Sequence, residues 1–350
     1  MQTKNKSAKK ITLVVLSYGK QDYLRRLIYL YKELSYHLII VDGSNSPWKS
    51  DKSGVLENLS WEYFAIPSPQ RTFKNYSERF IRSVNLVTSP YMVFIDDEEF
   101  LFPSGIKSAI NFLESNPSYS AAGGQIFVVD TENQHRVSTW GRKSTMFELS
   151  EDKSIDRMMK LVFHQRTANL MYQVVPTGLY KKFVKILSLS NFANSIRFHS
   201  SLEIFQSLFL SQQGNWQMHS YPYWIRIIGP SNENTSEINF LSASEIKLIC
   251  RNLFKYGTKE CYSLEKIMDV CWGGNSDYYA QLKTSLNLKS KKKISKYYIF
   301  KHFFKKIVKT KNLNQFEGVS LEEIKHFIKT IKDYPMGISE KEFDYLSRIE

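Results

Sequence analysis

The chain has 350 residues, of which 42% are hydrophobic and 14% aromatic, and its formal net charge is +14. This composition excludes a disordered or fibrous chain, and the length suffices for one large domain with an appendage. The positive charge favours a partner that carries phosphate. Nucleic acid, anionic lipid and a nucleotide-linked substrate all meet that condition, and charge alone does not choose among them.

The cysteines and the first residues predict a cytoplasmic location. Cys250, Cys261 and Cys271 form no CxxC pair, which gives no sign of a disulfide framework or a zinc site and fits a reducing compartment. The basic, polar residues 1–10 lead into a short apolar run that is too short for a signal peptide or a membrane span. Peripheral association with the inner face of the membrane is the alternative.

Strand-forming runs alternate with helical patterns through the first hundred residues. Continuous apolar runs predict strands at 11–18, 37–42, 61–67 and 91–96. Apolar residues at helical spacing predict helices at 21–34 and 72–87. The alternation indicates an α/β fold with a mostly parallel sheet and helices on both faces.

The pattern becomes more varied in the rest of the chain. It predicts, in order, a helix at 104–117, a strand at 121–130, a polar loop or excursion at 131–156, a helix at 201–214 and a strand at 215–229. Gly214 is the expected cap of the second helix, and Pro222 the expected break in the last strand. From about residue 236 onward the pattern predicts helix.

Polar, turn-prone residues follow three of the predicted strands. They are Ser17-Tyr18-Gly19, Asp42 to Asn45, and Asp96 to Glu99. In a parallel sheet the carboxyl ends of the strands meet at one edge, where ligands bind. The three clusters therefore predict a binding site.

Four consecutive carboxylates, Asp96–Asp97–Glu98–Glu99, stand between apolar residues. Such acids repel one another, and a hard divalent cation such as Mg²⁺ or Mn²⁺ removes that repulsion. On an extended chain Asp96 and Glu98 would point one way, and Asp97 and Glu99 the other. The alternative is a solvated loop whose acids cap the following helix.

These strand ends resemble the motifs of GT-A glycosyltransferases of the family-2-like group. The stretch "LSYGKQDYLRRLI" is similar to the family's first strand turn and helix, "IIVDGSN" to the end of its second strand, and "TSPYMVFIDDEEF" to the approach to its metal motif. The resemblance covers the first third of the chain well and reaches about Gly229 more weakly. It does not include the lysine-rich tail.

The resemblance implies a GT-A-like, Rossmann-like fold and a metal-dependent glycosyltransferase. Such an enzyme would move a sugar from a nucleotide-sugar donor to a glycan or lipid-linked acceptor, with inversion, in surface polysaccharide or glycan biosynthesis. The implied organisation is a flexible basic segment at 1–10, a catalytic domain at 11–235 and a helical, lysine-rich region at 236–350. Within the catalytic domain, 11–130 would bind the nucleotide sugar and 131–235 the acceptor.

Site residues on the donor side also come from the resemblance. Asp42 matches the acid that contacts the base or ribose, and Ser17 and Tyr18 match the turn that lines the nucleotide pocket. The acid cluster matches the DxD motif, which binds the diphosphate through Mn²⁺ or Mg²⁺. Aligning the strand favours Asp96 and Glu98, whereas aligning Phe100 favours Asp97 and Glu99. Asp97 is the first choice, because both alignments place it inside the motif.

The catalytic base implied by the resemblance is Glu203, near the start of the helix at 201–214. The alternative is an ordinary acid stabilised by the helix dipole. His219 resembles the histidine that some GT-A enzymes add as a late metal ligand, against the alternative of a packed or surface histidine. Lys74 and Arg226 are candidates for contacts with diphosphate, or else solvated or ion-paired charges.

On the acceptor side, Tyr223 and Trp224 are candidates for stacking on a sugar, with Arg226 beside them. Aromatic residues at alternating positions of a strand are also typical of a core. A sugar nucleotidyltransferase is a second function for the same fold class. It would need a glycine-rich loop after the first strand, and "SYGKQDYLRR" holds a single glycine.

The tail segment Lys289–Lys311 holds ten lysines and no carboxylate, interleaved with aromatic residues. It predicts an anionic membrane surface as partner, or a solvated helical face. A nucleic-acid-binding function through this basic region is the remaining alternative and the least favoured.

Overall fold

The structure is a computed structural model. It describes the residues 10–19, 21–32, 36–45, 61–67, 72–130, 136–139, 147–163, 170–189, 201–228, 243–255 and 257–272. The segment Lys289–Lys311 lies outside these residues. In the part of the chain that is described, no helix combines the length and the apolar character needed to cross a membrane.

The first sheet is parallel over four strands. It runs in the order β3-β2-β1-β4-β9 and contains β1 (Ile11–Ser17), β2 (His37–Asp42), β3 (Trp61–Ala65), β4 (Tyr91–Ile95) and β9 (Val175–Pro176). The short β9 pairs antiparallel with β4 and closes one edge. Every residue of β1 is buried, which explains why its sequence is almost continuously apolar.

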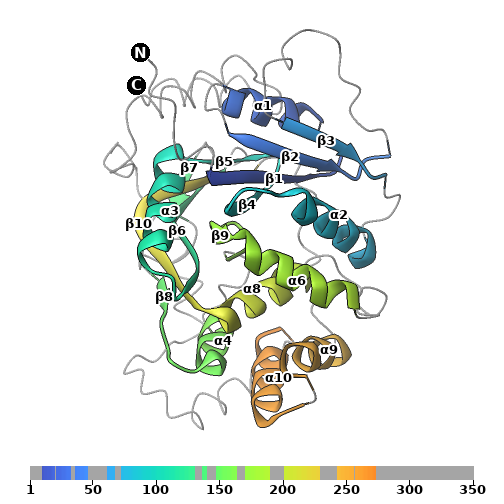
Figure 1. The fold of residues 1–350 in the computed structure, drawn as a ribbon, viewed down its shortest axis with the longest axis vertical. Helices are drawn as coiled ribbons and strands as arrows, with labels where there is room; N and C mark the ends of the chain where they lie inside the picture. The colour runs from blue at the N-terminus through green and yellow to red at the C-terminus, as the bar shows by residue number, and fades with distance from the viewer. Residues whose placement is uncertain are drawn as a thin grey trace.

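Helices cover both faces of this sheet, as the alternation of patterns predicts. In Figure 1, α1 (Gln21–Lys32) and α2 (Phe73–Leu86) lie on opposite sides of the strands. Helix α2 begins where the hydroxyl of Thr72 accepts a hydrogen bond from the amide of Asn75 at 3.2 Å. This cap satisfies one of the amide groups that a helix start leaves without a partner.

A second sheet packs beside the first and runs in the order β5-β10-β6-β7. It contains β5 (Glu99–Leu101), β6 (Tyr119–Asp130), β7 (Arg136–Thr139) and β10 (Asn215–Ile228), and β8 (Phe147–Leu149) also pairs with β10. β10 is parallel to β6 and antiparallel to β5. Its register shifts on either side of Pro222, where the sequence predicts a break.

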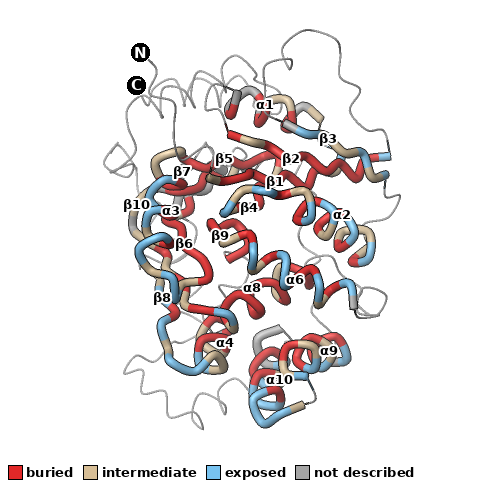
Figure 2. The backbone as a smooth tube through the Cα atoms, viewed as in Figure 1, coloured by how far each residue is buried: buried red, intermediate tan, exposed pale blue. Residues whose placement is uncertain are grey.

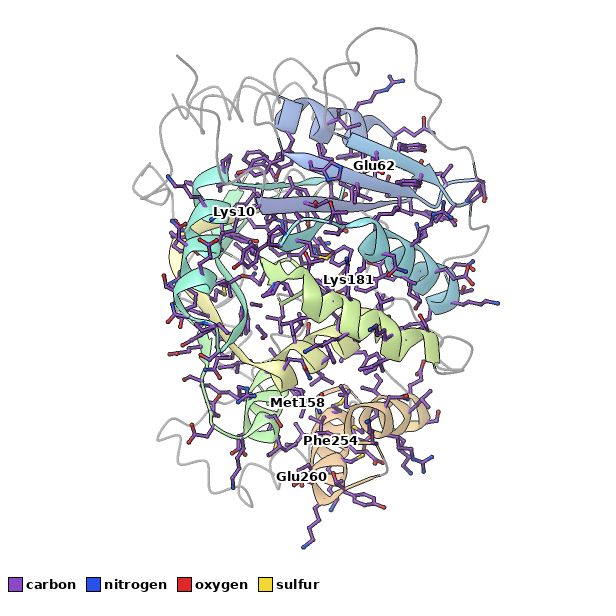
Figure 3. All side chains as sticks on the ribbon, in the orientation of Figure 1. Lys10, Glu62, Met158, Lys181, Phe254 and Glu260 are labelled. Carbon is purple, nitrogen blue, oxygen red and sulfur yellow. The ribbon has the colours of Figure 1, made fainter. Side chains whose placement is uncertain are left out.

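The remaining helices are α3 (Pro103–Ser115), α4 (Ser154–Phe163), α6 (Thr177–Leu189), α8 (Ser201–Gln213), α9 (Ala243–Phe254) and α10 (Lys259–Trp272). α3 packs on β6 and β10, and an ion pair of 2.6 Å joins its Glu114 to Lys10, the residue before β1. Lys10 is labelled in Figure 3. α10 packs on α9 and α4. Buried residues run through β1, β2, β4 and α8, whereas the outward sides of α3, α6 and α10 are exposed (Figure 2).

Two predictions of local structure need correction. Residues 131–156 are not simply a loop, because β7, β8 and the start of α4 fall within them. Gly214 follows the last residue of α8 as predicted, but it has no left-handed φ. Glycine is needed there for a close approach instead, since an added Cβ would lie 2.7 Å from the carbonyl oxygen of Ser118.

Candidate functional site

The centre of the first sheet is a topological switch point. β1 and β4 are neighbours, yet the chain continues from β1 to β2 on one side and reaches β4 only after β3. Ligands in open α/β sheets bind in the crevice at such a point, outside the carboxyl ends of the strands. The predicted polar clusters end the three strands that meet here.

Asp42, at the end of β2, is held by its neighbours. Its Oδ1 accepts hydrogen bonds from the amide (2.9 Å) and the hydroxyl of Ser44, and its Oδ2 accepts one from the hydroxyl of Tyr63 (2.6 Å). Ser44 in turn accepts a hydrogen bond of 2.6 Å from the amide of Gly19, whose φ of +74° suits glycine. The turns after β1 and β2 are therefore built as one unit.

The acid cluster joins this unit through Ser17. The hydroxyl of Ser17 donates a hydrogen bond of 2.7 Å to Oδ2 of Asp97. Ser17 is the register partner of Asp42, and its carbonyl oxygen accepts a hydrogen bond from the amide of Gly43 at 3.0 Å. The structure thus brings Ser17, Asp42 and Asp97 together, as the sequence predicts.

The four acids form a turn, so the predicted alternation of their side chains is wrong. Asp97 and Glu98 occupy the turn between β4 and β5, and the amide of Glu99 donates to the carbonyl of Asp96 at 3.2 Å. The amide of Asp96 donates back to Oε2 of Glu99 at 3.3 Å. Asp96 and Glu99 therefore lie on one side of the turn. The alternation of side chains holds only along an extended strand, and the chain reverses here.

Glu99 and Arg226 face each other across the pair β5–β10. Oε1 of Glu99 lies 3.7 Å from Nε of Arg226, and the Glu99 side chain has no exposed surface. Burial, followed by the charge of Asp96, raises the pKa of Glu99 well above its ordinary value, although Arg226 opposes this. Burial works to lower the pKa of Arg226, but Glu99 and the other acidic groups outweigh it, so the pKa of Arg226 is raised.

Glu203 approaches the same acids from the helical side. It lies in the first turn of α8, and burial raises its pKa to about 7. The charge of Asp96 adds to this rise, and Arg226 opposes it. The structure therefore brings the predicted base into electrostatic contact with the predicted donor-side acids, with a pKa suited to proton transfer near neutrality.

Two residues of the site have no counterpart in the sequence predictions. The hydroxyl of Tyr172 donates a hydrogen bond of 2.9 Å to Oδ2 of Asp96. Arg79 is 3% exposed, and its Nη1 donates to the carbonyl of Ser17 at 2.9 Å. Its guanidinium also lies 5.5 Å from the ring centroids of both Tyr18 and Tyr76. The sequence could have identified Arg79, because it is a cation among the uncharged residues of the buried face of α2.

Lys74 and Trp224 were also predicted site residues. Lys74 is exposed in the first turn of α2, whereas Arg79 of the same helix is buried beneath Ser17. Trp224 is 3% exposed and stacks on Tyr172 with ring centroids 4.3 Å apart, so it belongs to the wall of the site.

Two of the predicted side chains do not reach the site. Tyr223 is fully buried among core residues, because its position in β10 points it away from the face that carries Trp224. His219 packs against Phe112 and Tyr221, seven residues before Arg226 in β10, on the order of 20 Å along a strand. The structure therefore does not bring Tyr223 or His219 together with the other predicted site residues.

Within the described residues, no group of three or more His, Cys, Asp or Glu side chains is arranged to hold a metal ion by itself. A Mg²⁺ or Mn²⁺ site of the kind predicted does not require one, since such ions take one or two carboxylates and complete their coordination with substrate phosphates and water. Oε1 of Glu99 accepts no hydrogen bond from the described residues, although it lies 3.7 Å from Nε of Arg226.

Comparisons with known proteins support the fold. No family model and no curated protein matches the sequence. The crystal structure of Staphylococcus aureus TarS 1–349 with UDP-GlcNAc matches 97% of this chain and 88% of its own, at 14% identity and a TM-score of 0.51. The corresponding complex with UDP matches at 13% identity, with 97% and 86% of the two chains and a TM-score of 0.48.

A further crystal structure of TarS contains a longer chain than residues 1–349. It matches 97% of this chain at 12% identity and a TM-score of 0.47, and this chain spans 53% of its length. TarS is a glycosyltransferase of the family-2-like group. The likeness to the UDP-GlcNAc complex, at a TM-score of 0.51 and 14% identity, establishes the fold and confirms the predicted α/β architecture of the GT-A type.

Proposed function

We propose, from the GT-A-type fold that the chain has, that this protein is a glycosyltransferase that uses a nucleotide-sugar donor. The observation that carries the proposal is the meeting of two acidic sets at the switch point. Asp42 and Asp97 are joined through Ser17 on one side, and Glu203 faces Asp96 on the other. This is the arrangement that a transfer between two substrates requires, because donor and acceptor must be held side by side.

The nucleotide would bind at the turns after β1 and β2. Asp42, Ser17 and Tyr18 are the proposed contacts. Three hydrogen bonds already fix the Asp42 carboxylate, and an ionised carboxylate has about four acceptor positions, so one remains for a ribose or base. Arg79 supports this surface from beneath through the Ser17 carbonyl.

The turn of acids would hold Mg²⁺ or Mn²⁺. The donor set fits such an ion, because its groups are carboxylate oxygens gathered in one turn. Asp97 and Glu98 are the first candidates, because the side chain of Glu99 faces Arg226 and the amide of Asp96. When bound, the cation would offset the charge of the diphosphate.

Glu203 is the proposed general base. A carboxylate with a pKa of about 7 can remove a proton from an acceptor hydroxyl as that oxygen attacks the sugar and the nucleoside diphosphate leaves. Arg226 and Trp224 are proposed to line the acceptor side. Direct displacement with inversion is the course that the family resemblance implies, and the acceptor is proposed to be a glycan or lipid-linked glycan in surface polysaccharide assembly.

A thermal-shift series tests the proposal. UDP-GlcNAc and UDP, each with and without Mn²⁺, are the first probes, because TarS was solved with both nucleotides. A ligand that binds the folded state raises the apparent melting temperature, and saturation at about 100 times Kd corresponds to about 2.7 kcal/mol. We expect a rise that is larger with Mn²⁺ and smaller in Asp97→Asn. No rise with any nucleotide sugar would rule out this donor class.

A further inference from the structure

Tyr172 occupies a fixed position between the two sheets. The adjacent Val174 exchanges two backbone hydrogen bonds with Ala122 of β6, at 3.0 and 3.1 Å, and Val175 begins β9 at the edge of the first sheet. The amide of Gln173 also donates to the carbonyl of Leu170 at 3.4 Å. Tyr172 itself is 5% exposed. Its backbone is thus attached to both sheets, and its side chain has little room to move.

Each end of the Tyr172 side chain contacts a different half of the site. The hydroxyl donates to Oδ2 of Asp96, which directly follows β4 of the first sheet. The ring stacks on Trp224 of β10 in the second sheet, with centroids 4.3 Å apart and an angle of 28° between the planes. A single rigid side chain therefore spans the space between a donor-side carboxylate and an acceptor-side aromatic.

The environment keeps the Tyr172 hydroxyl a hydrogen-bond donor. Asp96 and Glu203 are the first two charges that act on the Tyr172 phenol, after the effect of burial, and all three raise its pKa well above the ordinary value. The phenol consequently stays protonated and can only donate to a carboxylate at this position. The hydrogen bond to Asp96 is part-buried, and hydrogen bonds to charged groups are stronger than those between neutral groups and fix geometry accordingly.

We propose that Tyr172 is a positioning residue, which holds the Asp96 carboxylate at a set distance from Trp224 and so aligns the donor and acceptor sides. This inference rests on the proposed function. Tyr172 does not act on the reacting atoms itself. It acts through Asp96. Replacing Tyr172 by phenylalanine would remove the hydroxyl and keep the ring.

The test compares Tyr172→Phe with the wild type in steady-state transfer from a nucleotide sugar. We expect kcat to fall about 10- to 100-fold, since a displacement of about 1 Å can cost that much. The donor KM should change less than about 3-fold, because Asp42, Ser17 and Tyr18 are left untouched. A merely structural role would lower only the fraction of folded protein. In that case kcat, calculated per folded molecule, would be unchanged in Tyr172→Phe.

Tyr180→Phe is the matched control. It also removes one buried phenol, whose hydroxyl contacts Gln206 and, at 3.4 Å, the carbonyl of Met171. We expect a similar loss of stability and an unchanged kcat. An equal fall of kcat in both variants would overturn the positioning role.

A second measurement does not depend on activity. In chemical unfolding, Tyr172→Phe and Asp96→Ala remove the same hydrogen bond, so the shift in midpoint for the double variant should be smaller than the sum of the two single shifts. Additive shifts would overturn the proposal. Absence of transfer by the wild type would instead overturn the proposed function, whereas normal kcat in Tyr172→Phe with an active wild type would overturn the positioning role alone.

Discussion

Glu203 shows how surroundings alone convert an ordinary acid into a candidate base. An isolated glutamate has a pKa of 4.5, and burial followed by the charge of Asp96 raises the pKa of Glu203 to about 7. A base must be ionised to act, so wild-type activity should rise with pH through about 7. The same shift has a consequence for stability, since the folded state binds this proton more tightly than the unfolded chain does.

The prediction at this position concerns Glu203→Gln. Transfer should fall by about 10²- to 10⁴-fold, since no carboxylate remains to accept the proton. The stabilising effect of the Glu203 proton is fully present below pH 4.5 and is lost as pH rises through about 7. At pH 8 the variant should therefore be more stable than the wild type by up to about 3 kcal/mol, at about 1.4 kcal/mol per pKa unit.

Initial rates together with urea unfolding at pH 4 and pH 8 measure both effects. The two proteins should have equal stability at the lower pH. Retained transfer would remove Glu203 as the base, and equal stability at both values of pH would mean that its carboxyl group is not buried beside Asp96.

At the scale of elements, the close contact between the end of β2 and helix α2 supports the part of the site around Ser17. Gly43 follows β2 directly, and a Cβ added there would lie 2.1 Å from Nη1 of Arg79. Arg79 cannot withdraw easily, because it is buried and bonded to the Ser17 carbonyl. The glycine is thus required by packing rather than by a left-handed backbone, which the structure shows at Gly19 instead.

We predict that Gly43→Ala lowers the free energy of unfolding by about 1 to 3 kcal/mol, as overpacking of a core does. It should also weaken binding of UDP, because the displaced Arg79 no longer supports Ser17. Gly178→Ala is the control: it lies in α6, where an added Cβ meets nothing within 4 Å. The control should be neutral or more stable by about 0.5 to 1 kcal/mol. Chemical denaturation and UDP titration of both variants measure these effects. Equal stability and equal UDP affinity in the two variants would contradict the packing argument.

Elements were predictable where the sequence pattern is local. The continuous apolar runs of β1, β2 and β4 predict a parallel sheet, and the edge rule then places Ser17, Asp42 and the acids together. The orientation of the acids was not predictable in this way, because the pattern does not reveal where Asp96 leaves the strand and the turn begins. Tyr172 was missed for a different reason: it bonds Asp96 from 76 residues away, and no local spacing encodes such a contact.

At the scale of the whole molecule, the net charge of +14 is the property that the described site explains least. Ten lysines fall in Lys289–Lys311, outside the residues that the structure describes. The proposed acceptor gives this segment a possible task, because a lipid-linked glycan is met at a membrane surface, where each lysine contributes about 1 kcal/mol of attraction to anionic lipid.

We predict that the full chain binds vesicles containing phosphatidylglycerol and leaves neutral phosphatidylcholine vesicles unbound. Binding should weaken steeply between 50 and 300 mM salt, since screening shortens the reach of the charges. Vesicle sedimentation measures this, with a variant in which the lysines of the segment are replaced by glutamine as the control. Oligonucleotides should not compete, and binding to them in preference to the vesicles would favour a nucleic acid as the partner.

Residues 96–98 also link β4 directly to β5, and so they carry the chain from the first sheet to the second. The length of this turn is therefore constrained both by the position of its acids and by the register of β5 against β10. One glycine inserted after Glu98 would shift β5 by one residue relative to β10, so that the glycine would lie opposite Arg226, Phe100 would lie opposite Trp224, and the Glu99 carboxylate would point into the opposite layer. Evolution can exchange the acids of this turn for one another far more readily than it can add to their number.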